Sequence, residues 1–314
     1  MGSALLLGFD IGGTKSAAII GDGNGSAMAH EEFRTSTPAE TIGHLIELGQ
    51  RLCEGEKPAA CGIACGGPLS SREGIILSPP NLPGWDRVPV VQMVRDAFGV
   101  PAVLENDANA AAVAEWRWGL NCEVDDLVYI TCGTGLGAGI IVGGRLIRGN
   151  QDLAGEIGHV RLLPMGPVGY YKAGSVEGLT SGTALGNLAR LRLQERHEPT
   201  RLDGLPLGQI TGKEVGEAAF DGDEFAIRIV REQADYLGQA CAILIDILNP
   251  QRISLGSTAR RLGSLLLEGV RAAAKREALP AAYENCVIDK AVLGDEIQDL
   301  AALAIAREAA ESVG

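Results

Sequence analysis

Two glycine-rich hairpins constrain the fold of this chain more than any other feature of its sequence. The first lies in LGFDIGGTKSAAII, which begins at Leu7, and the second in LVYITCGTGLGAGIIVGGRLIRG, from Leu127 to Gly149. In each segment an apolar run stops at glycines and then resumes, which is the pattern of a strand, a tight turn and a second strand. This repetition predicts two halves of related architecture.

Strands and helices alternate through the rest of the chain, which predicts an α/β protein. Strands are expected at 60–68, 101–107, 252–257 and 286–294, and helices at 108–119, 224–250, 261–279 and 295–313. The polar residues 196–214 form the one long irregular stretch, which we expect on the surface.

The composition argues against several classes of protein. A formal net charge of −13 disfavours a general surface for nucleic acid or anionic membrane. No apolar run reaches membrane-spanning length and no charged leader opens the chain, so we expect a cytoplasmic protein. The seven cysteines contain no CxxC pair and are expected to be small buried side chains.

Two common phosphate-binding motifs nearly match the glycine turns but must be rejected. A P-loop requires Gly-Lys-Ser/Thr followed by a helix, whereas Thr14-Lys15 is followed by an apolar strand. The segment GTGLGA, which begins at Gly133, fits the dinucleotide fingerprint on paper. That fingerprint must open a helix, and this segment continues as a strand.

The two turns together still indicate a site for a polyphosphate. Glycines let backbone N–H groups point into one concave surface, where they bind an anion without a charged side chain. Thr14 and Thr134 add hydroxyl donors, and Lys15 adds a positive charge. Two such hairpins facing each other across a cleft would hold a polyphosphate from both sides.

Asp10 ends the first apolar run, just before Gly12 and Gly13. A carboxylate beside a phosphate is unfavourable unless a divalent cation lies between them. Asp10 is therefore a candidate ligand of such a cation, through a water molecule. The alternative is that Asp10 only caps the turn.

Five segments carry a resemblance to a known family. DIGGTK, PNLPGW, LENDANAAAVAEW, TCGTGLGAGIIVGGRL and AGEIGH occur in the order and spacing of the ROK family of sugar kinases and sugar-responsive repressors. That family belongs to the superfamily of actin, hexokinase and Hsp70. The chain resembles it from about Leu5 to Gly256, with a weaker match beyond. DIGGTK marks only the superfamily, whereas END and EIGH at this separation are more specific.

The resemblance implies an actin-like ATPase fold, with two ribonuclease-H-like domains around a central cleft. The first domain would comprise residues 1–117 and 297–314, because the last helix crosses back to it, and the second residues 118–296. The resemblance also implies ATP-dependent phosphorylation of a hexose hydroxyl, typically the 6-hydroxyl, with Mg²⁺. The partners would be a sugar and a nucleotide, and the protein would be a homodimer.

Asp107 is the candidate general base. A hydroxyl is a poor nucleophile, and a carboxylate within hydrogen-bond reach can take its proton as the phosphoryl group is transferred. Asn106 would bind sugar hydroxyls. The alternative for both residues is a helix cap, because they stand at a predicted strand-to-helix junction.

The resemblance implies further ligands. Glu156 and His159 are three residues apart, so one helical turn would place both on one face. The other sugar ligands would be Gly67, Asn81, Glu156, His159 and Glu177. The nucleotide ligands would be Asp10, Gly12, Gly13, Thr14, Lys15, Thr131, Gly133, Thr134 and Gly135, with Gly256 and Ser257 beside adenine and ribose.

One feature of many family members is missing. Those proteins follow ExGH with a CxCGxxGCxE cluster, whose three cysteines hold a structural zinc together with the histidine. Here Val168, Tyr170 and Ser175 stand at the cysteine positions, so we predict no structural zinc. We expect Tyr170 and Tyr171 to pack the loop in place of the metal.

Three functions are compatible with such a chain. A sugar kinase is favoured because Asp10, Asp107, Glu156 and both glycine turns are present. A non-catalytic sugar sensor of the repressor kind would carry a basic helix-turn-helix segment before the first turn, and only a few residues precede it here. An ATPase of the chaperone or filament kind is disfavoured because END and EIGH suit a small polar ligand.

The sequence leaves the substrates open. Glucose is the first candidate for the sugar, and N-acetylmannosamine or N-acetylglucosamine is the alternative. The phosphoryl donor could be polyphosphate as well as ATP.

Overall fold

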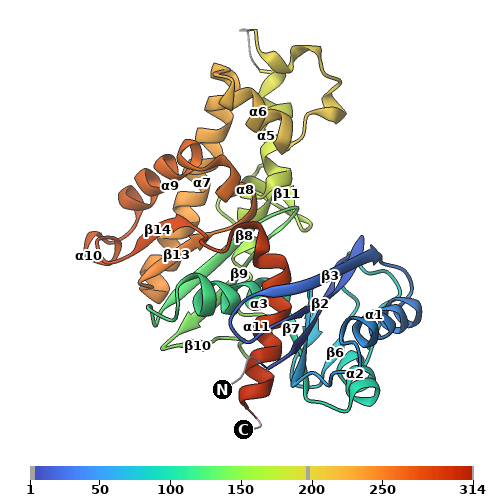
Figure 1. The fold of residues 1–314 in the computed structure, drawn as a ribbon. Helices are drawn as coiled ribbons and strands as arrows, with labels where there is room; N and C mark the ends of the chain where they lie inside the picture. Colours follow the sequence, from blue (N-terminus) through green and yellow to red (C-terminus); the bar gives the residue numbers. More distant parts are fainter. Residues whose placement is uncertain (1–3, 196–198, 313–314) are drawn as a thin grey trace. The chain divides into compact units, whose positions relative to one another are not determined.

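The computed structural model describes residues 4–195 and 199–312, which form two compact units (Figure 1). Unit 1 contains the residues up to Glu123, Gly139–Ala154 and the residues from Asp295 onward. Unit 2 contains Val124–Ala138 and Gly155–Gly294. The domain boundaries that the resemblance implies stay a prediction. They differ from the compact units chiefly at residues 139–154, which group with unit 1.

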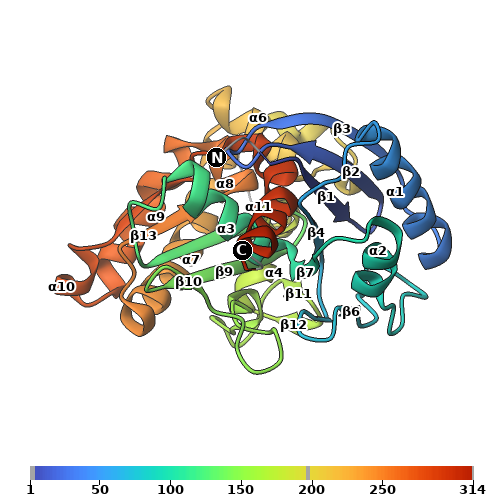
Figure 2. The same ribbon diagram turned by 60° about the horizontal axis from the view of Figure 1, so that its bottom comes forward.

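Unit 1 is built on a mixed sheet of five strands. These are β1 (Leu6–Ile11), β2 (Lys15–Gly21), β3 (Ala27–Arg34), β4 (Ala60–Cys65) and β7 (Ala102–Asn106), in the order β3-β2-β1-β4-β7 (Figure 2). The first three strands form an antiparallel meander, and β4 and β7 add parallel to β1. A short hairpin of β5 (Leu69–Ser70) and β6 (Ile75–Ile76) follows β4.

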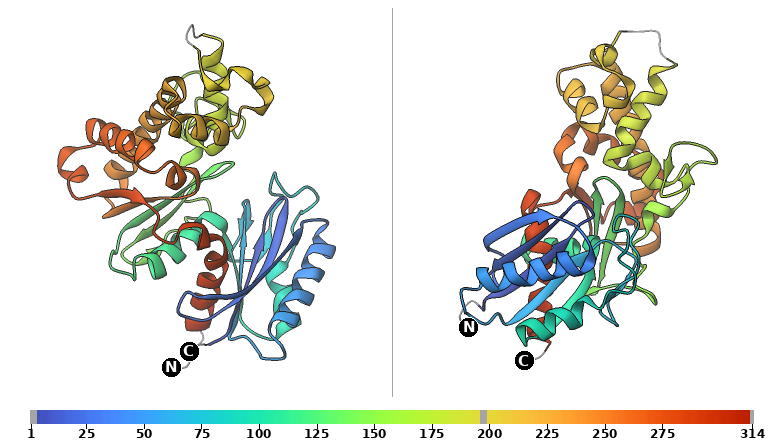
Figure 3. Two further views of the ribbon diagram at one scale, coloured as in Figure 1. Left: turned by 45° about the horizontal axis from the view of Figure 1, so that its top comes forward. Right: turned by 90° about the vertical axis from the view of Figure 1, so that its right-hand side faces the viewer.

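Helices cover both faces of this sheet, which explains why β1 and β4 are apolar almost throughout. Figure 3 shows α1 (Pro38–Leu52) and α2 (Val90–Phe98) on one face and α11 (Ile297–Glu311) on the other. The helix α3 (Asp107–Ala114) packs against α11 and continues into a π-helical turn, Glu115–Gly119. The core between the sheet and α1 includes Phe9, Ile42, Ile63 and Trp85.

The close fit of α11 against the sheet depends on two glycines. A Cβ atom at Gly62 would lie 2.1 Å from the carbonyl oxygen of Ala302, and one at Gly8 would lie 2.9 Å from the Ala302 Cβ. Both glycines belong to neighbouring strands, β4 and β1, and alanines fill the facing side of the helix. Small residues on both partners therefore let the helix backbone approach the strands.

The second sheet repeats the order of the first. Its strands are β8 (Leu127–Cys132), β9 (Leu136–Val142), β10 (Arg145–Leu146), β13 (Arg252–Leu255) and β14 (Val287–Lys290), in the order β10-β9-β8-β13-β14. As in the first sheet, three consecutive strands are followed by two that add in parallel. The predicted relation between the two halves is confirmed. The boundary between the compact units falls within β9.

Unit 2 is otherwise mainly helical. Its helices are α4 (Val176–Thr180), α5 (Gly182–Leu193), α6 (Gly212–Phe220), α7 (Glu224–Leu248), α8 (Ser257–Leu262), α9 (Ser264–Glu277) and α10 (Pro280–Tyr283). Short 3₁₀ turns span Ile157–His159, Arg201–Gly204, Leu207–Gln209 and Gly294–Glu296, and a small hairpin pairs β11 (Val168–Gly169) with β12 (Lys172–Ala173). Of the stretch predicted to be irregular, residues 196–198 lie outside the described part of the chain.

The long helices α7 and α9 pack closely because glycines and alanines line the contact between them. A Cβ atom at Gly238 would lie 2.4 Å from the Cβ of Ala273, and one at Gly269 would lie 2.7 Å from the Cβ of Ala234. Asn249, in the left-handed conformation, ends α7 just before Pro250. The predicted stop at this Asn-Pro pair is confirmed.

The cysteines match their expected role in six of seven cases. Cys53, Cys61, Cys65, Cys132, Cys241 and Cys286 are buried free thiols, while Cys122 is exposed. In the part of the chain that the structure describes, no helix combines the length and the apolar character needed to cross a membrane.

Candidate active site

The first glycine turn connects β1 to β2 in unit 1. The N–H of Gly12 donates to the carbonyl of Lys15 at 3.0 Å, and the hydroxyl of Thr35 donates to the carbonyl of Gly12 at 2.7 Å. A Cβ atom at Gly13 would lie 2.6 Å from the backbone oxygen of Asn81. The turn is therefore tight, and the structure brings Gly13 and Asn81, two predicted site residues, together.

The ammonium group of Lys15 is paired with a carboxylate outside this turn. Its ammonium group hydrogen bonds to the carboxylate of Glu32, on the neighbouring strand β3, and both side chains are at least half exposed. Thr14 is also exposed. A phosphate-binding role for Lys15 stays a prediction, and it would require the ammonium group to exchange its partner.

The charge of Asp107 acts on the carboxyl group of Asp10 within unit 1. Burial raises the pKa of Asp10 to about 7, with further contributions from the charges of Asp107 and Asp299, while His30 lowers it. Loss of hydration also raises the pKa of Asp107, and the N–H of Ala108 opposes this shift. The residue Asp107 as a whole is nevertheless exposed. We ascribe its raised pKa to the protein atoms that surround the carboxylate and displace part of its hydration.

The strand-to-helix turn after β7 presents Asn106 and Asp107. The Oδ1 atom of Asn106 accepts the N–H of Ala108 at 3.0 Å and so caps α3. The Oδ1 atom of Asp107 accepts the same N–H at 2.8 Å. The capping alternative thus holds for Asn106, but it uses only one atom of the amide. Its Nδ2 atom lies 3.5 Å from where a Cβ of Gly67 would be, beside the Gly-Gly-Pro turn after β4.

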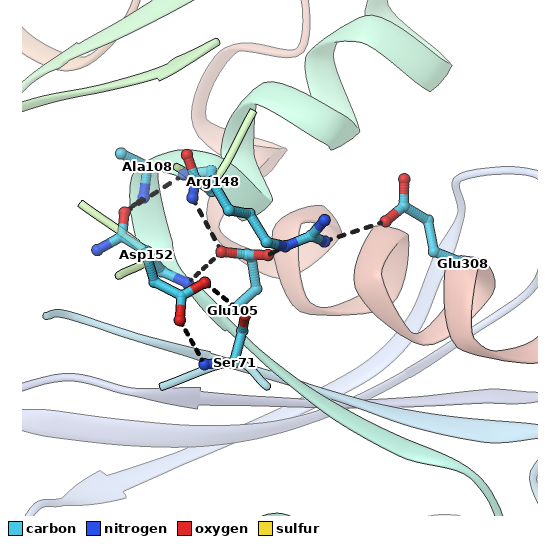
Figure 4. A network of polar contacts seen from close by, with 8 residues as sticks. Ser71, Glu105, Ala108, Arg148, Asp152 and Glu308 are labelled. Atoms are coloured by element: carbon cyan, nitrogen blue, oxygen red, sulfur yellow. Dashed lines mark hydrogen bonds and ion pairs between the residues drawn. The ribbon is translucent and has the colours of Figure 1, made fainter. Parts of the chain in front are cut away.

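Behind this turn lies an ion pair between a buried carboxylate and a partly exposed guanidinium group, which sequence reasoning did not single out. Glu105 is 1% exposed, and its Oε2 atom accepts the Nε–H of Arg148 at 2.6 Å (Figure 4). Glu105 is the first letter of END, so a signal for it was present in the sequence. Arg148 lies 43 residues further along the chain, and no local pattern identifies it.

The second glycine turn connects β8 to β9. The carbonyl of Gly133 accepts the N–H of Gly182 at 2.8 Å, and the hydroxyls of Thr131 and Ser257 lie 3.2 Å apart. Thr134, at the tip, is exposed. Unit 2 therefore places Thr131, Gly133 and Ser257, which were predicted to contact the nucleotide, in one cluster.

Gly256, just before α8, is tightly packed beside this cluster. A Cβ atom at Gly256 would lie 2.2 Å from the hydroxyl of Tyr129, and Ser257 has a φ of 51°. A Cβ atom at Gly182 would lie 2.6 Å from the hydroxyl of Thr258. Gly182 and Thr258 were not predicted. Gly182 could have been found from the sequence, because it follows Ser181, a residue that typically caps the start of a helix.

Glu177 joins the second turn to EIGH. Its Oε2 atom accepts the N–H of Leu136 at 3.0 Å, next to Gly135. A Cβ atom at Gly158 would lie 3.4 Å from the Cβ of Glu177. Three predicted elements, the second glycine turn, EIGH and Glu177, are therefore adjacent within unit 2.

EIGH folds differently from the predicted helical turn. Ile157–His159 form a single 3₁₀ turn, and Glu156 precedes it with a ψ of 43°. The side chains of Glu156 and His159 are both exposed. The backbone carbonyl of His159 accepts the ammonium group of Lys172 at 2.8 Å, so β12 holds the turn in place.

The expectation that Tyr170 and Tyr171 pack the loop after EIGH is wrong. They form the tip of the β11–β12 hairpin, where they are 55% and 92% exposed, with φ angles of 41° and 62°. Only the Tyr170 ring approaches EIGH, edge-on to His159 with 6.1 Å between ring centroids.

The loop after EIGH is held instead by close backbone contacts at three glycines. Cβ atoms at Gly169, Gly174 and Gly178 would lie 2.3, 2.2 and 2.4 Å from backbone atoms of neighbouring turns. Within residues 4–195 and 199–312, no group of three His, Cys, Asp or Glu side chains could hold a metal ion.

The predicted residues thus fall into two sets. Unit 1 holds Gly67, Asn81, Asn106 and Asp107 with the first glycine turn, and unit 2 holds Glu156, His159, Glu177, Gly256 and Ser257 with the second. Each set is gathered on the ends of strands and the starts of helices, where backbone N–H groups are available for ligands.

The sequence is similar to those of known sugar kinases over most of the chain. A glucokinase of Streptomyces coelicolor is 35% identical over 281 residues, which are 87% of this chain and 87% of that protein. An N-acetylmannosamine kinase of Salmonella arizonae is 32% identical over 284 residues, 83% of this chain and 97% of that one.

A solved structure agrees in fold as well as in sequence. The ROK family glucokinase from Streptomyces griseus, crystallised with glucose and AMPPNP, superposes with a TM-score of 0.81 and 34% identity, over 97% of this chain and 99% of that one. Together these findings define a sugar kinase of the actin-like ATPase fold. The chain belongs to the ROK family, whose model matches residues 6–309.

Proposed function

We propose that this protein transfers the terminal phosphoryl group of ATP to the 6-hydroxyl of glucose. Its similarity to glucokinases from two Streptomyces species, over most of both chains, supports the choice of sugar. AMPPNP in the crystal structure of the Streptomyces griseus glucokinase supports ATP as the donor. The observation that carries the proposal is the placement of Asp10, near the end of β1, and Asp107, the first residue of α3, whose charge raises the pKa of Asp10.

Asp107 would act as the general base. A base works best when its pKa approaches the working pH, and loss of hydration raises the pKa of Asp107 above that of an ordinary aspartate. As the first residue of α3, it is fixed at a strand-to-helix junction rather than on a loose loop. It would accept the hydroxyl proton while the phosphoryl group is transferred.

The negative charge around Asp10 favours a divalent cation that phosphate oxygens would hold together with this one carboxylate. Its carboxylate is half-buried, and burial and the neighbouring charge of Asp107 raise its pKa to about 7. A cation would relieve this unfavourable concentration of negative charge. Asp10 would hold Mg²⁺ through a water molecule, and the ion would supply positive charge beside the phosphates.

The remaining residues would bind and orient the substrates. In unit 1, the N–H of Gly13 would donate to a phosphate oxygen, whereas the N–H of Gly12 closes the turn onto Lys15. The Nδ2 atom of Asn106 would donate to a sugar hydroxyl. In unit 2, Gly133 and Gly135 would serve the phosphates in the same way. Glu156, His159 and Glu177 would bind the ring hydroxyls, and Gly256 and Ser257 the adenosine.

A second sugar class is favoured by a specific finding. The N-acetylmannosamine kinase of Salmonella arizonae matches over 97% of its own length at nearly the same identity as the glucokinase. An N-acetylmannosamine or N-acetylglucosamine kinase is therefore the alternative, since an added acetyl group is discriminated by pocket shape.

A panel assay decides between these possibilities. ADP release is measured with ATP and Mg²⁺ against glucose, mannose, allose, fructose, N-acetylmannosamine and N-acetylglucosamine, with polyphosphate as a second donor. We expect the highest kcat/KM for glucose with ATP. A higher value for an N-acetylated sugar would select the alternative, and ADP release that no sugar stimulates would overturn the proposed function.

A further inference from the structure

The side chain of Arg148 reaches the base of the turn that carries Asn106 and Asp107. Its Nε–H donates to the Oε2 atom of Glu105 at 2.6 Å, and its Nη2 atom lies 3.9 Å from the carboxylate of Glu308 on α11 (Figure 4). All of these residues belong to unit 1. Arg148 is thus the cation between two carboxylates, one of which is fully buried.

The other oxygen of Glu105 holds the turn itself. Its Oε1 atom accepts the backbone N–H of Asn106 at 2.9 Å and the Nδ2–H of Asn109 at 2.9 Å. One acceptor thus ties the end of β7 to the first turn of α3. Asp107 lies between these two anchored residues, so the direction of its side chain depends on the orientation of the Glu105 carboxylate.

The carboxylate of Glu105 needs Arg148 in order to stay where it is. An ionised carboxylate that is buried without a partner is strongly unfavourable, and it either takes up a proton or draws in water. Either change would weaken its hydrogen bonds to Asn106 and Asn109.

The segment that carries Arg148 is itself fastened to unit 1. Asp152, four residues later, accepts the backbone N–H of Ser71 at 3.0 Å and its hydroxyl at 2.5 Å (Figure 4). Two polar anchors on this segment, Arg148 and Asp152, therefore fix the guanidinium group relative to Glu105.

We propose that Arg148 is a positioning residue for the reaction, which acts through Glu105 to hold the Asn106-Asp107 turn in its productive orientation. This inference rests on the proposed function, in which Asp107 is the base. Arg148 is not among the residues assigned to either substrate. Because Asn106 also binds the sugar, we expect a small effect on sugar binding and a larger one on kcat. A shift of about 1 Å in a reacting group can cost about 10²-fold in rate.

The test exchanges the ion pair for a neutral pair. In Arg148→Met, Glu105 is left without its cation, and kcat with D-glucose and ATP should fall by about 10-fold or more. In Glu105→Gln, the amide nitrogen that replaces Oε2 faces the Arg148 donor, so kcat should also fall. In the double variant, the Gln oxygen can accept both hydrogen bonds and no buried charge remains. The double variant should therefore recover several-fold in kcat over Arg148→Met.

Arg145→Met is the matched control, because Arg145 is exposed on β10 and three residues away; its kcat should equal that of the wild type. Calorimetric Kd values for D-glucose should change less than about threefold in every variant that folds. Should the panel assay select N-acetylmannosamine, the same measurements are made with that sugar.

The outcomes separate this inference from the proposed function. If Arg148→Met keeps the wild-type kcat, or if the double variant is no faster than Arg148→Met, the positioning role is wrong. Asp107→Asn is assayed alongside. A large loss in that variant together with a normal Arg148→Met overturns only the positioning role, whereas a normal Asp107→Asn overturns the proposed function itself.

Discussion

The carboxylate of Glu177 accepts the backbone N–H of Leu136 at 3.0 Å. A residue that the family resemblance assigns to the sugar therefore also holds the second glycine turn, which is assigned to the phosphates. One side chain in unit 2 thus connects two groups of predicted ligands.

Replacing Glu177 should separate these two tasks. Glu177→Gln keeps an oxygen that can accept the N–H of Leu136, whereas Glu177→Ala leaves that donor without its partner. We expect the KM for ATP to rise about fivefold in Glu177→Ala and less than about twofold in Glu177→Gln, because one such hydrogen bond contributes about 1 kcal/mol. Steady-state kinetics with D-glucose measures both values. Equal KM values for ATP in the two variants would show that the turn does not depend on Glu177.

The raised pKa of Asp10 predicts how stability changes with pH. A carboxylate whose pKa is about 7 in the folded state, against 3.8 for an ordinary aspartate, destabilises the fold increasingly as the pH rises between these values. In the absence of Mg²⁺, Asp10→Asn should therefore gain stability relative to the wild type from pH 4 to pH 7, by up to about 4 kcal/mol. Urea unfolding at pH 5 and pH 8 checks this.

Mg²⁺ provides the companion measurement. Added Mg²⁺ should raise the unfolding free energy of the wild type at pH 8 and have little effect on Asp10→Asn. If the difference in stability between the two proteins were the same at both pH values, Asp10 would have an ordinary pKa.

The contact of Gly62 with α11 predicts a large loss of stability on substitution. A Cβ atom there would lie 2.1 Å from the Ala302 carbonyl oxygen, a backbone atom that cannot turn away. Gly62→Ala should destabilise the protein by about 2–3 kcal/mol. The control is Gly43→Ala on the exposed side of α1, where no atom lies within 4 Å of the new methyl group. It should stabilise by about 0.5–1 kcal/mol. Equal unfolding midpoints for the two variants would contradict the close packing of α11.

Elements of the fold and site that depend on a local sequence pattern could be predicted from the sequence. The repeated strand-turn-strand pattern predicts both sheets, and the run from β7 into α3 places Asn106 and Asp107 at one junction. Alternation of apolar segments with Asn-Pro and glycine breaks also predicts α7 and β13.

Contacts between distant segments could not be predicted in this way. Arg148 meets Glu105 only because residues 139–154 pack in unit 1, and Lys15 meets Glu32 only because β2 pairs with β3. Tyr170 and Tyr171 were expected inside because large aromatic residues usually bury their surface. They occupy instead the two central positions of a two-residue hairpin, where both side chains point into solvent.

The turnover of Asp107→Asn tests the central claim most directly. The variant keeps the size of the side chain and one oxygen that can accept the N–H of Ala108 at the start of α3, but it removes the ability to accept a proton. We predict that kcat with ATP and D-glucose falls by about 10² or more while calorimetry still detects sugar binding. A turnover close to that of the wild type would contradict the role of Asp107 as the general base.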